Sequence, residues 1–414
     1  MTPLPTIFVH IISYRDPELP KTIEDCLAKA KFPHRVEFGV CWQHGEDETP
    51  QSAFGPYRKR VRAIIDVPAK NALGCCWARA HSQALYDGED YVLQLDSHHR
   101  FEPGWDETLI EMMRQTGAEK PAITSYAGSY EADNTKNDCV PWVMTPKPFS
   151  PDGSLQFVPK RITDWQTRTS PVPARFASGH FFFTLGRHCT EIPYDPDLYF
   201  LGEELIMAAR SWTHGYDLFH PHRLVVWHQY HRRGRPKIWE DAPDTHRSRD
   251  KVSKDRVLKI MGQAENLCDV GPYGLGNVRT LAAYERFVGI DFKNRLIHQE
   301  AFDGVAPPTT WKDEQTWYAS LMREYTVSVT WPDGKVEQPV DTRFIAYIIE
   351  DAAGKVLWRQ DVHEAEGFAP DPVAKFLSAT APARLIVWLN LKNLQWWKRR
   401  FAFTLTPSTF YATS

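Results

Sequence analysis

The chain has 414 residues, of which 42% are hydrophobic and 24% are charged, and these proportions exclude intrinsic disorder as its main state. Its 49 Lys and Arg residues nearly balance its 52 Asp and Glu residues, so the strong net basic charge of many nucleic-acid-binding proteins is absent. A chain of this length favours two or three domains, or one large domain with an appendage. Its 15 tryptophans offer aromatic faces on which sugars or bases can stack.

The sequence carries no signal for a membrane or a secretory route. No apolar segment reaches the roughly 18–20 residues of a membrane-spanning helix, and the first residues lack the basic region and small-residue cleavage site of a signal peptide. Seven cysteines include no CxxC pair, and the adjacent Cys75 and Cys76 are poorly placed for a mutual disulfide. We therefore expect reduced thiols, no transmembrane segment and a cytoplasmic location.

Strand and helix patterns alternate over residues 6–130. Apolar positions at helical spacing occur in 19–30, 77–85 and 105–113, and buried-strand patterns occur at 6–13, 36–42, 61–67, 91–95 and 122–126. This alternation predicts an α/β fold of the Rossmann-like type, with a mostly parallel sheet flanked by helices. Ligands of such sheets bind at the carboxyl ends of the strands.

The character of the sequence changes after about Asp291. The segment Ala306-Pro307-Pro308 has the composition of a linker, and short strand patterns separated by Gly, Asp and Pro turns follow at 325–331, 344–350, 356–359, 384–391 and 401–405. These patterns predict a C-terminal β-sandwich module. We expect a catalytic domain at 1–292, a linker at 293–312 and an accessory domain at 313–414.

Basic residues cluster between His231 and Lys259. One interpretation is a solvated helix or loop face, and the other is a mobile lid that meets a phosphate-bearing ligand. The cluster contains Arg232, Arg233, Arg235, Lys237, Arg247, Arg249, Lys251 and Lys254.

The tripeptide Asp96-Ser97-His98 directly follows the apolar strand pattern at 91–95. In an extended chain residues i and i+2 project to the same side, so the Asp96 carboxylate and the His98 imidazole can hold one ion at the end of a parallel strand. An imidazole ligand argues against a purely Mg²⁺ site and favours a metal such as Mn²⁺. The alternative is that Asp96 caps the next turn and that His98 and His99 lie on the surface.

Further motifs follow this tripeptide in a fixed order, and together they suggest a family. They are Gly104-Trp105, Ala177-Ser178-Gly179-His180-Phe181-Phe182, Phe200-Leu201-Gly202-Glu203-Glu204 and Val225-Val226-Trp227-His228. The order resembles that of the GT-A glycosyltransferases that transfer N-acetylhexosamines to polypeptides, which have a DSH metal motif, a Gly-Trp pair, a small-residue strand, a WGGEN-like acidic loop and a final metal-binding His.

The closest resemblance is to the polypeptide N-acetylglucosaminyltransferases that modify hydroxyproline on a cytoplasmic ubiquitin-ligase subunit, and a more distant one is to the polypeptide N-acetylgalactosaminyltransferases. It covers residues 6–292 and omits the C-terminal module. Further segments that carry it are 12–16, 39–43, 77–79, 93–98 with Phe101, and 273–276 with 279–280. In the acidic loop only Gly202 and Glu203 match, which leaves the role of Glu204 open.

The resemblance implies a metal site and a donor site. Asp96, His98 and His228 would hold a divalent metal, most simply Mn²⁺, between the phosphates of a UDP-sugar. The donor-binding residues implied are Ser13, Tyr14 and Arg15 at the uridine, together with Arg79, Asp96 and Gly179.

For catalysis the resemblance implies that Glu203 orients the acceptor hydroxyl or accepts its proton. Each site residue also has a purely structural explanation. These are a helix-N-terminal acid for Glu203, a hydrogen-bonded core imidazole for His228, an ion pair with Asp87 or Asp90 for Arg79, and a turn with a helix cap for residues 13–16.

Two functions of different classes follow. The first is a metal-dependent glycosyltransferase that moves N-acetylglucosamine from UDP-GlcNAc to a protein or glycan hydroxyl, for which the resemblance implies retention of anomeric configuration. The second is a catalytically degenerate carbohydrate- or nucleotide-binding protein with a lectin-like C-terminal module, in which Trp388, Trp396 and Trp397 either bind sugar or pack in the core. An intact set of Asp96, His98 and His228 favours the enzyme.

Overall fold

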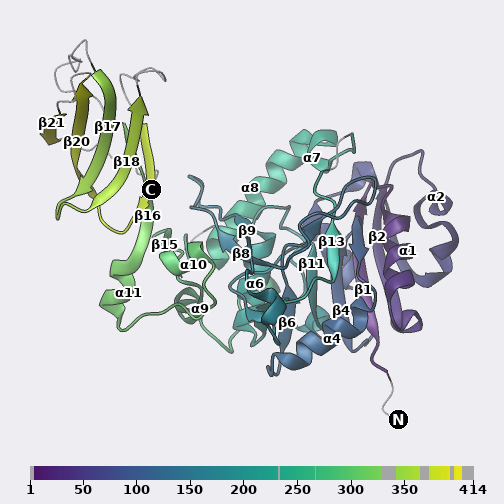
Figure 1. Ribbon diagram of the computed structural model, residues 1–414. Coiled ribbons are helices and arrows are strands. Elements are labelled where there is room, and N and C mark those ends of the chain that lie inside the picture. Colours follow the sequence, from purple (N-terminus) through teal and green to yellow (C-terminus); the bar gives the residue numbers. More distant parts are fainter. Residues whose placement is uncertain are drawn as a thin grey trace. The chain divides into compact units, whose positions relative to one another are not determined.

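The computed structural model describes residues 4–231, 234–265, 267–328, 342–363, 373–391 and 396–402 (Figure 1). Contacts divide the chain into two units, residues 1–294 with 300–310 and residues 295–299 with 311–414. The finer boundaries expected from the sequence, with a linker at 293–312, stay a prediction.

An eight-stranded sheet forms the centre of the first unit, in the order β10-β12-β6-β11-β4-β1-β2-β3. Within it β3, β2, β1, β4, β6 and β12 run in one direction, while β11 and β10 are antiparallel to their neighbours. The mostly parallel sheet predicted from the sequence is therefore confirmed. Its strands are β1 (Ile7–Tyr14), β2 (Val36–His44), β3 (Val61–Pro68), β4 (Tyr91–Asp96), β6 (Pro121–Thr124), β10 (Val172–Pro173), β11 (Phe181–Leu185) and β12 (Asp217–His220).

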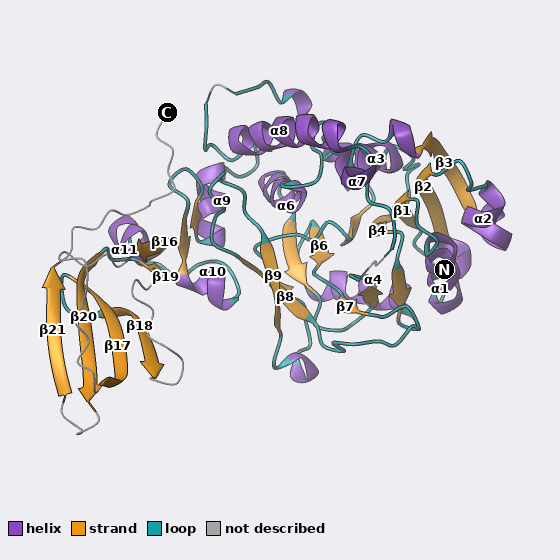
Figure 2. Ribbon diagram, turned by 90° about the horizontal axis from the view of Figure 1, so that it is seen from above, coloured by secondary structure: helices purple, strands orange, loops and turns teal. Residues whose placement is uncertain are grey.

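Helices cover both faces of this sheet (Figure 2). Because strand side chains alternate between faces, Val9 and Ile11 of β1 pack with α1 (Leu19–Lys29) and α4 (Trp105–Gln115), which lie on one face. Ile12 faces the opposite way and packs near Ala78 of α3 (Cys75–Gln83). Helix α6 (Glu203–Thr213) lies on the same side as α3 (Figure 2).

A small second sheet sits beside the end of β4. It is formed by β5 (His99–Phe101), β13 (Val226–His228) and β7 (Gly128–Ser129), with β13 in the middle. His228 pairs with His99 on one side and with Ser129 on the other. Because β5 begins three residues after β4 ends, this pairing carries His228 to the carboxyl end of β4.

Shorter elements complete the first unit. The loop-rich region 131–180 contains an antiparallel pair of strands, β8 (Trp142–Pro146) and β9 (Phe157–Arg161). The basic stretch forms α7 (Ile238–Asp241) and α8 (Pro243–Ile260), and its Arg232 and Arg233 lie outside the described residues. The other elements are α2 (Pro50–Phe54), α5 (His188–Glu191), α9 (Leu281–Val288), β14 (Ile290–Asp291) and α10 (Gln299–Asp303).

The second unit is built from antiparallel strands, as the sequence predicts. One sheet contains β15 (Leu296–His298), β16 (Leu321–Ser328) and β19 (Val373–Ser378), and α11 (Glu314–Ser320) leads directly into β16. The other has the order β18-β17-β20-β21, formed by Val356–His363, Thr342–Asp351, Pro382–Leu391 and Trp396–Ala402. One buried cluster joins Tyr325 and Ala374 of the first sheet to Ile345 and Val387 of the second, which makes a sandwich.

Within this unit the sequence anticipates most of the described strands but misses β15 and β19. Residues 329–331 and 403–405 of two predicted strands lie outside the described residues. Trp388 is half-buried beside Ile348 and Ile386, on the face of its sheet that points away from the sandwich core. The side chains of Trp396 and Trp397 are not among those described.

Candidate active site

The carboxyl ends of β1 and β4 place two polar segments side by side. Ile12 of β1 pairs with Asp96 of β4, so the residues after Ile12 and those after Asp96 leave the same edge of the sheet. Here β1 continues into Ser13 and Tyr14, followed by Arg15, whose φ of 46° turns the chain sharply. This edge is where an α/β sheet binds its ligands.

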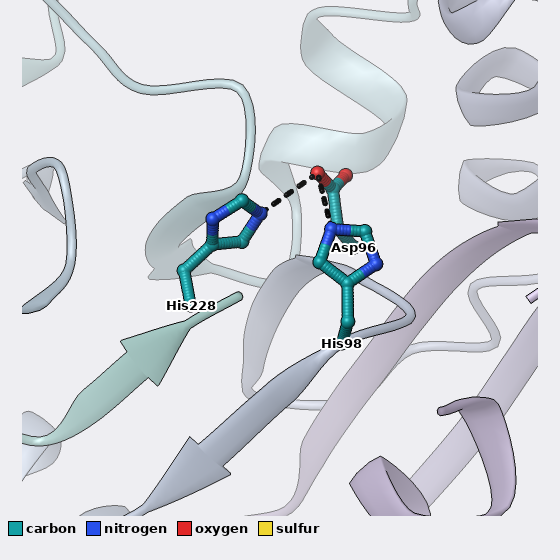
Figure 3. A group of neighbouring side chains, drawn as sticks. All are labelled: Asp96, His98 and His228. Atoms are coloured by element: carbon teal, nitrogen blue, oxygen red, sulfur yellow. Dashed lines mark ion pairs between the residues drawn. The ribbon is translucent and has the colours of Figure 1, made fainter. Parts of the chain in front are cut away.

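Asp96, His98 and His228 converge at this edge (Figure 3). The Asp96 Oδ2 atom lies 3.4 Å from His228 Nε2 and 3.9 Å from His98 Nε2. Both Nε2 atoms are buried and make no hydrogen bond within the described part of the chain. One oxygen and two imidazole nitrogens, all within 4.8 Å of one another, have the composition and spacing of a site for a divalent transition metal.

This geometry decides between the explanations offered for the two histidines. His98 and His99 are 2% and 0% exposed, so the expectation that they could lie on the surface is wrong. A core imidazole with satisfied hydrogen bonds is also excluded for His228, because neither of its ring nitrogens has a hydrogen-bond partner among the described residues. The neighbouring rings of His99, His180 and Tyr230 hold His228 at centroid distances of 5.0, 4.3 and 4.4 Å.

Asp16 fixes the orientation of His98. Its Oδ2 accepts hydrogen bonds from His98 Nδ1 at 2.7 Å and from Ser97 Oγ at 2.8 Å, while Arg235 donates to Oδ1 at 2.9 Å. Burial raises the pKa of Asp16, but the bonds from His98 and Arg235 outweigh it and hold the pKa below its ordinary value. With Nδ1 donating to this carboxylate, the lone pair of His98 is on Nε2, which faces Asp96.

Arg79 ties the Asp96 carboxylate to Glu203. It is 1% exposed and donates to Asp96 Oδ1 at 2.6 Å, to the Leu95 carbonyl at 3.2 Å and to Glu203 Oε1 at 2.5 Å. Burial opposes ionisation of Asp96, but Arg79 and the imidazoles beside it keep its pKa well below the ordinary value. The alternative of a pair between Arg79 and Asp87 or Asp90 is wrong.

Glu203 is the first residue of α6, and its carboxylate also lies in the candidate site. Besides the bond from Arg79, its carboxylate accepts a hydrogen bond from the Tyr194 hydroxyl at 3.0 Å and a contact from Cys75 Sγ at 3.4 Å. The helix-N-terminal explanation and the pocket position therefore apply together. A Cβ atom at Gly179 would lie 2.8 Å from Glu203 Oε2, so a larger residue there would force the Glu203 carboxylate to shift.

Glu204 lies next to Glu203 but has a different environment. It accepts hydrogen bonds from the Tyr126 hydroxyl at 2.7 Å and from the Gly179 amide at 3.1 Å. Its pKa is raised to about 7. Burial is the main cause and Glu203 and Asp96 add to the rise, while the two hydrogen bonds oppose it.

Two cavities meet at Asp96. The first is lined by residues from β1 and β4 and by the segment before α7, and the second extends from Asp96 toward α6. The first contains Ser13, Tyr14, Asp16, Gln43, Asp96, His98, Phe200, Pro236, Lys237 and Trp239, and the second Cys75, Arg79, Asp96, Tyr126, Gln156, Phe157, Gly179, His180, Phe200, Glu203, Glu204, His228 and Tyr230. The structure thus brings together at this region every residue that the sequence assigned to the metal, donor and catalytic sites, with Arg15 at the edge beside Tyr14.

The segment 235–241 closes over the first cavity. Asp241 accepts hydrogen bonds from the Tyr14 hydroxyl at 2.7 Å and from Arg15 at 2.9 Å. Trp239 packs against Phe200 with ring centroids 5.7 Å apart. Basic residues further along are paired with acidic side chains: Arg247 binds Asp244 at an exposed position, and Lys254 binds Asp152 and Asp250.

No site role followed from the sequence for Asp16 or Tyr126, and Arg235 stood out only as a member of the basic cluster. The signals for Asp16 are its place two residues after the end of β1 and its position in segment 12–16 of the family resemblance. His220 is buried outside this site, where its ring binds the Thr124 carbonyl and the Met144 amide.

A family model described as "GlcNAc: Glycosyltransferase (GlcNAc)" matches residues 6–57 and 56–294, which is most of the chain. The chain belongs to this family of glycosyltransferases. The match extends over the first unit and includes every residue of the candidate site. No curated protein matches the chain significantly.

Solved structures give weaker similarities. GalNAc-T7 with UDP, GalNAc and Mn²⁺ is 14% identical, with a TM-score of 0.44 over 96% of this chain and 69% of that one. TarS 1-349 of S. aureus in complex with UDP-GlcNAc is 13% identical, with a TM-score of 0.35 over 61% of this chain and 70% of that one. Among the described residues, no helix is both long and apolar enough to cross a membrane.

Proposed function

We propose that this glycosyltransferase transfers N-acetylglucosamine from UDP-GlcNAc to a hydroxyl of a protein or glycan, in a Mn²⁺-dependent reaction that retains anomeric configuration. The observation that carries the proposal is the convergence of Asp96, His98 and His228, in which two imidazole nitrogens face the carboxylate and make no hydrogen bond among the described residues. The family match supports the donor class.

The residues of the metal site fit the ion. Asp96 supplies an ionised carboxylate, and His98 is fixed by Asp16 with its Nε2 lone pair toward the site. His228 is held by the pairing of β13 and by the surrounding rings. The bound ion would stabilise the negative charge that develops on the departing UDP.

The first cavity would take the nucleotide. Its wall carries the Ser13 hydroxyl and the Gln43 Oε1 atom, both buried without a hydrogen-bond partner among the described groups. Tyr14 and Arg15 present a hydroxyl and a cation at its edge, where they now bind Asp241. These groups can hydrogen-bond a uracil base, a ribose or a phosphate.

The second cavity would take the transferred sugar. Gly179 leaves room beside Glu203, and Glu203 would contact the sugar or orient the acceptor hydroxyl. Arg79 would position Asp96 and Glu203, because its guanidinium already binds both. Because the Glu203 carboxylate is paired with Arg79, we expect the acceptor hydroxyl to attack from the front side of the sugar. A phosphate oxygen of UDP would help to take the proton of that hydroxyl.

A screen of UDP-sugars for metal-dependent hydrolysis tests this function. The proposal predicts release of UDP from UDP-GlcNAc with Mn²⁺, little release with a chelator, and a loss of about 100-fold or more in His98→Ala. Calorimetry with UDP provides a second readout, because His98→Ala should weaken binding only when Mn²⁺ is present. Equal UDP binding with and without chelator would contradict the metal assignment. Metal-dependent binding of UDP without turnover of any donor would favour the degenerate binding protein instead.

A further inference from the structure

The two carboxylates at the start of α6 are adjacent in sequence but differ in what they bind. Glu203 is paired with the Arg79 guanidinium, and it also binds the Tyr194 hydroxyl. Glu204 has no cation within salt-bridge distance among the described residues, and it receives only the Tyr126 hydroxyl and the Gly179 amide. Both line the cavity that contains Asp96 and His228. Glu203 is therefore paired with a basic side chain, and Glu204 is not paired with one among the described residues.

The geometry of Glu204 leaves it able to bind a further donor. Each of its oxygens accepts one hydrogen bond, Oε2 from Tyr126 and Oε1 from Gly179, and a carboxylate oxygen can accept two. The side chain is half-buried, with the cavity on its open side. Its two existing bonds hold the carboxylate in one orientation, so a hydroxyl entering the cavity meets a fixed acceptor.

The surrounding wall indicates what kind of molecule brings that hydroxyl. Aromatic rings line it, and Tyr230 and Phe200 are 42% and 45% exposed. The basic side chain that lines it, Arg79, is already bound to two carboxylates. Apart from the metal that the proposed function places at Asp96 and His228, this wall offers rings and carboxylates without a free basic side chain, which suits an uncharged hydroxyl compound better than an anionic one.

We propose that Glu204 binds the acceptor, accepting a hydrogen bond from the attacking hydroxyl of an uncharged substrate and so orienting its oxygen. This rests on the proposed function and adds the acceptor-binding residue to it. The family's acidic loop does not predict this role, because the chain departs from the WGGEN-like pattern at this position.

Water serves as the acceptor probe, because it carries the same hydroxyl donor and makes the test independent of the natural acceptor. Hydrolysis of UDP-GlcNAc is measured with Mn²⁺ for the wild type, Glu204→Gln and Glu204→Asp, and UDP affinity with Mn²⁺ is measured by calorimetry. We expect kcat to fall by about tenfold or more in both variants. The dissociation constant of UDP should stay within about twofold, since Glu204 does not line the nucleotide cavity.

Tyr126→Phe is the matched control, because it keeps the carboxylate and removes one of the hydrogen bonds that hold it. Its kcat should fall by less than that of Glu204→Gln. Unchanged kcat in Glu204→Gln would overturn the inference, and so would a parallel loss of UDP affinity, which would indicate a structural role. A wild type that neither binds UDP with Mn²⁺ nor hydrolyses UDP-GlcNAc would instead refute the proposed function.

Discussion

Asp16 lies behind the candidate metal site and determines which nitrogen of His98 faces it. The residue is 7% exposed and binds His98, Ser97 and Arg235 together. From the sequence, residues 13–15 were expected in a uridine site and residues 13–16 in a turn with a helix cap, and the Glu18 amide does bind Asp16 Oδ1 at 3.0 Å. Because that local role is sufficient to explain an aspartate at this position, its long-range contact with His98 could not be read from the sequence.

Asp16→Asn should weaken metal binding without removing a ligand. The amide cannot stabilise the orientation of His98 as a carboxylate does, so we expect a loss of about 10- to 100-fold in Mn²⁺ affinity, measured by calorimetry with UDP present. Asp66→Asn is the control, since Asp66 is exposed and binds only His44 among the described residues. An Mn²⁺ affinity equal to the wild type would show that Asp16 does not orient the ligand.

At the scale of elements, the first turn of α6 depends on a glycine. Gly202 has a φ of 92°, and a side chain there would lie 2.3 Å from Val257 Cγ2 of α8. Gly202→Ala therefore combines backbone strain with a clash at the turn that carries Glu203 and Glu204.

We expect Gly202→Ala to lower the free energy of unfolding by about 3 kcal/mol or more, measured by denaturant titration. Gly88→Ala separates the two effects, because Gly88 has a φ of 91° and open space around it. The control should lose only about 1 kcal/mol from strain. Equal losses in the two variants would show that α8 yields to the extra methyl group.

The segment 235–241 is the second element whose role can be tested. It is held by Asp241 on Tyr14 and Arg15, and by Arg235 on Asp16. If it acts as a lid, cleavage by trypsin after Lys237 should slow in the presence of UDP and Mn²⁺. Asp241→Asn should speed cleavage of the free protein. Equal cleavage rates with and without nucleotide would count against the lid.

At the scale of the whole molecule, the alternation of β-branched strands and amphipathic helices was enough to predict the sheet. The small sheet of β5, β13 and β7 was not predicted, because its strands have two or three residues and come from distant parts of the chain. Periodicity cannot detect such pairings. The place of His228 in the site was therefore inferable only from the family resemblance, whereas Asp96 and His98 followed from the strand itself.

The stability of the whole molecule should depend on pH through Glu285 of α9. Its pKa is raised to about 7. Burial is the main cause and Asp291 adds to the rise, while the Phe292 amide and Arg286 oppose it. Between pH 4.5, the ordinary pKa of a glutamate, and about pH 7, Glu285 is therefore protonated in the folded protein but ionised in the unfolded chain. Stability from this group is fully present below pH 4.5 and is lost as the pH rises toward about 7.

The comparison of wild type with Glu285→Gln isolates this effect. Relative to the variant, the wild type should lose free energy of unfolding between about pH 5 and 8, measured by denaturant titration at each pH. A difference between the two proteins that does not change with pH would show that Glu285 is ionised in the folded state.

The central claim is that Asp96, His98 and His228 hold one divalent metal ion. Anomalous X-ray scattering at the manganese edge, from crystals grown with Mn²⁺ and UDP, tests it most directly. We expect a single strong peak in contact with Asp96 Oδ2 and the Nε2 atoms of both histidines, and no such peak in His228→Ala. A peak elsewhere, or wild-type crystals with UDP bound and no manganese between these three side chains, would contradict it.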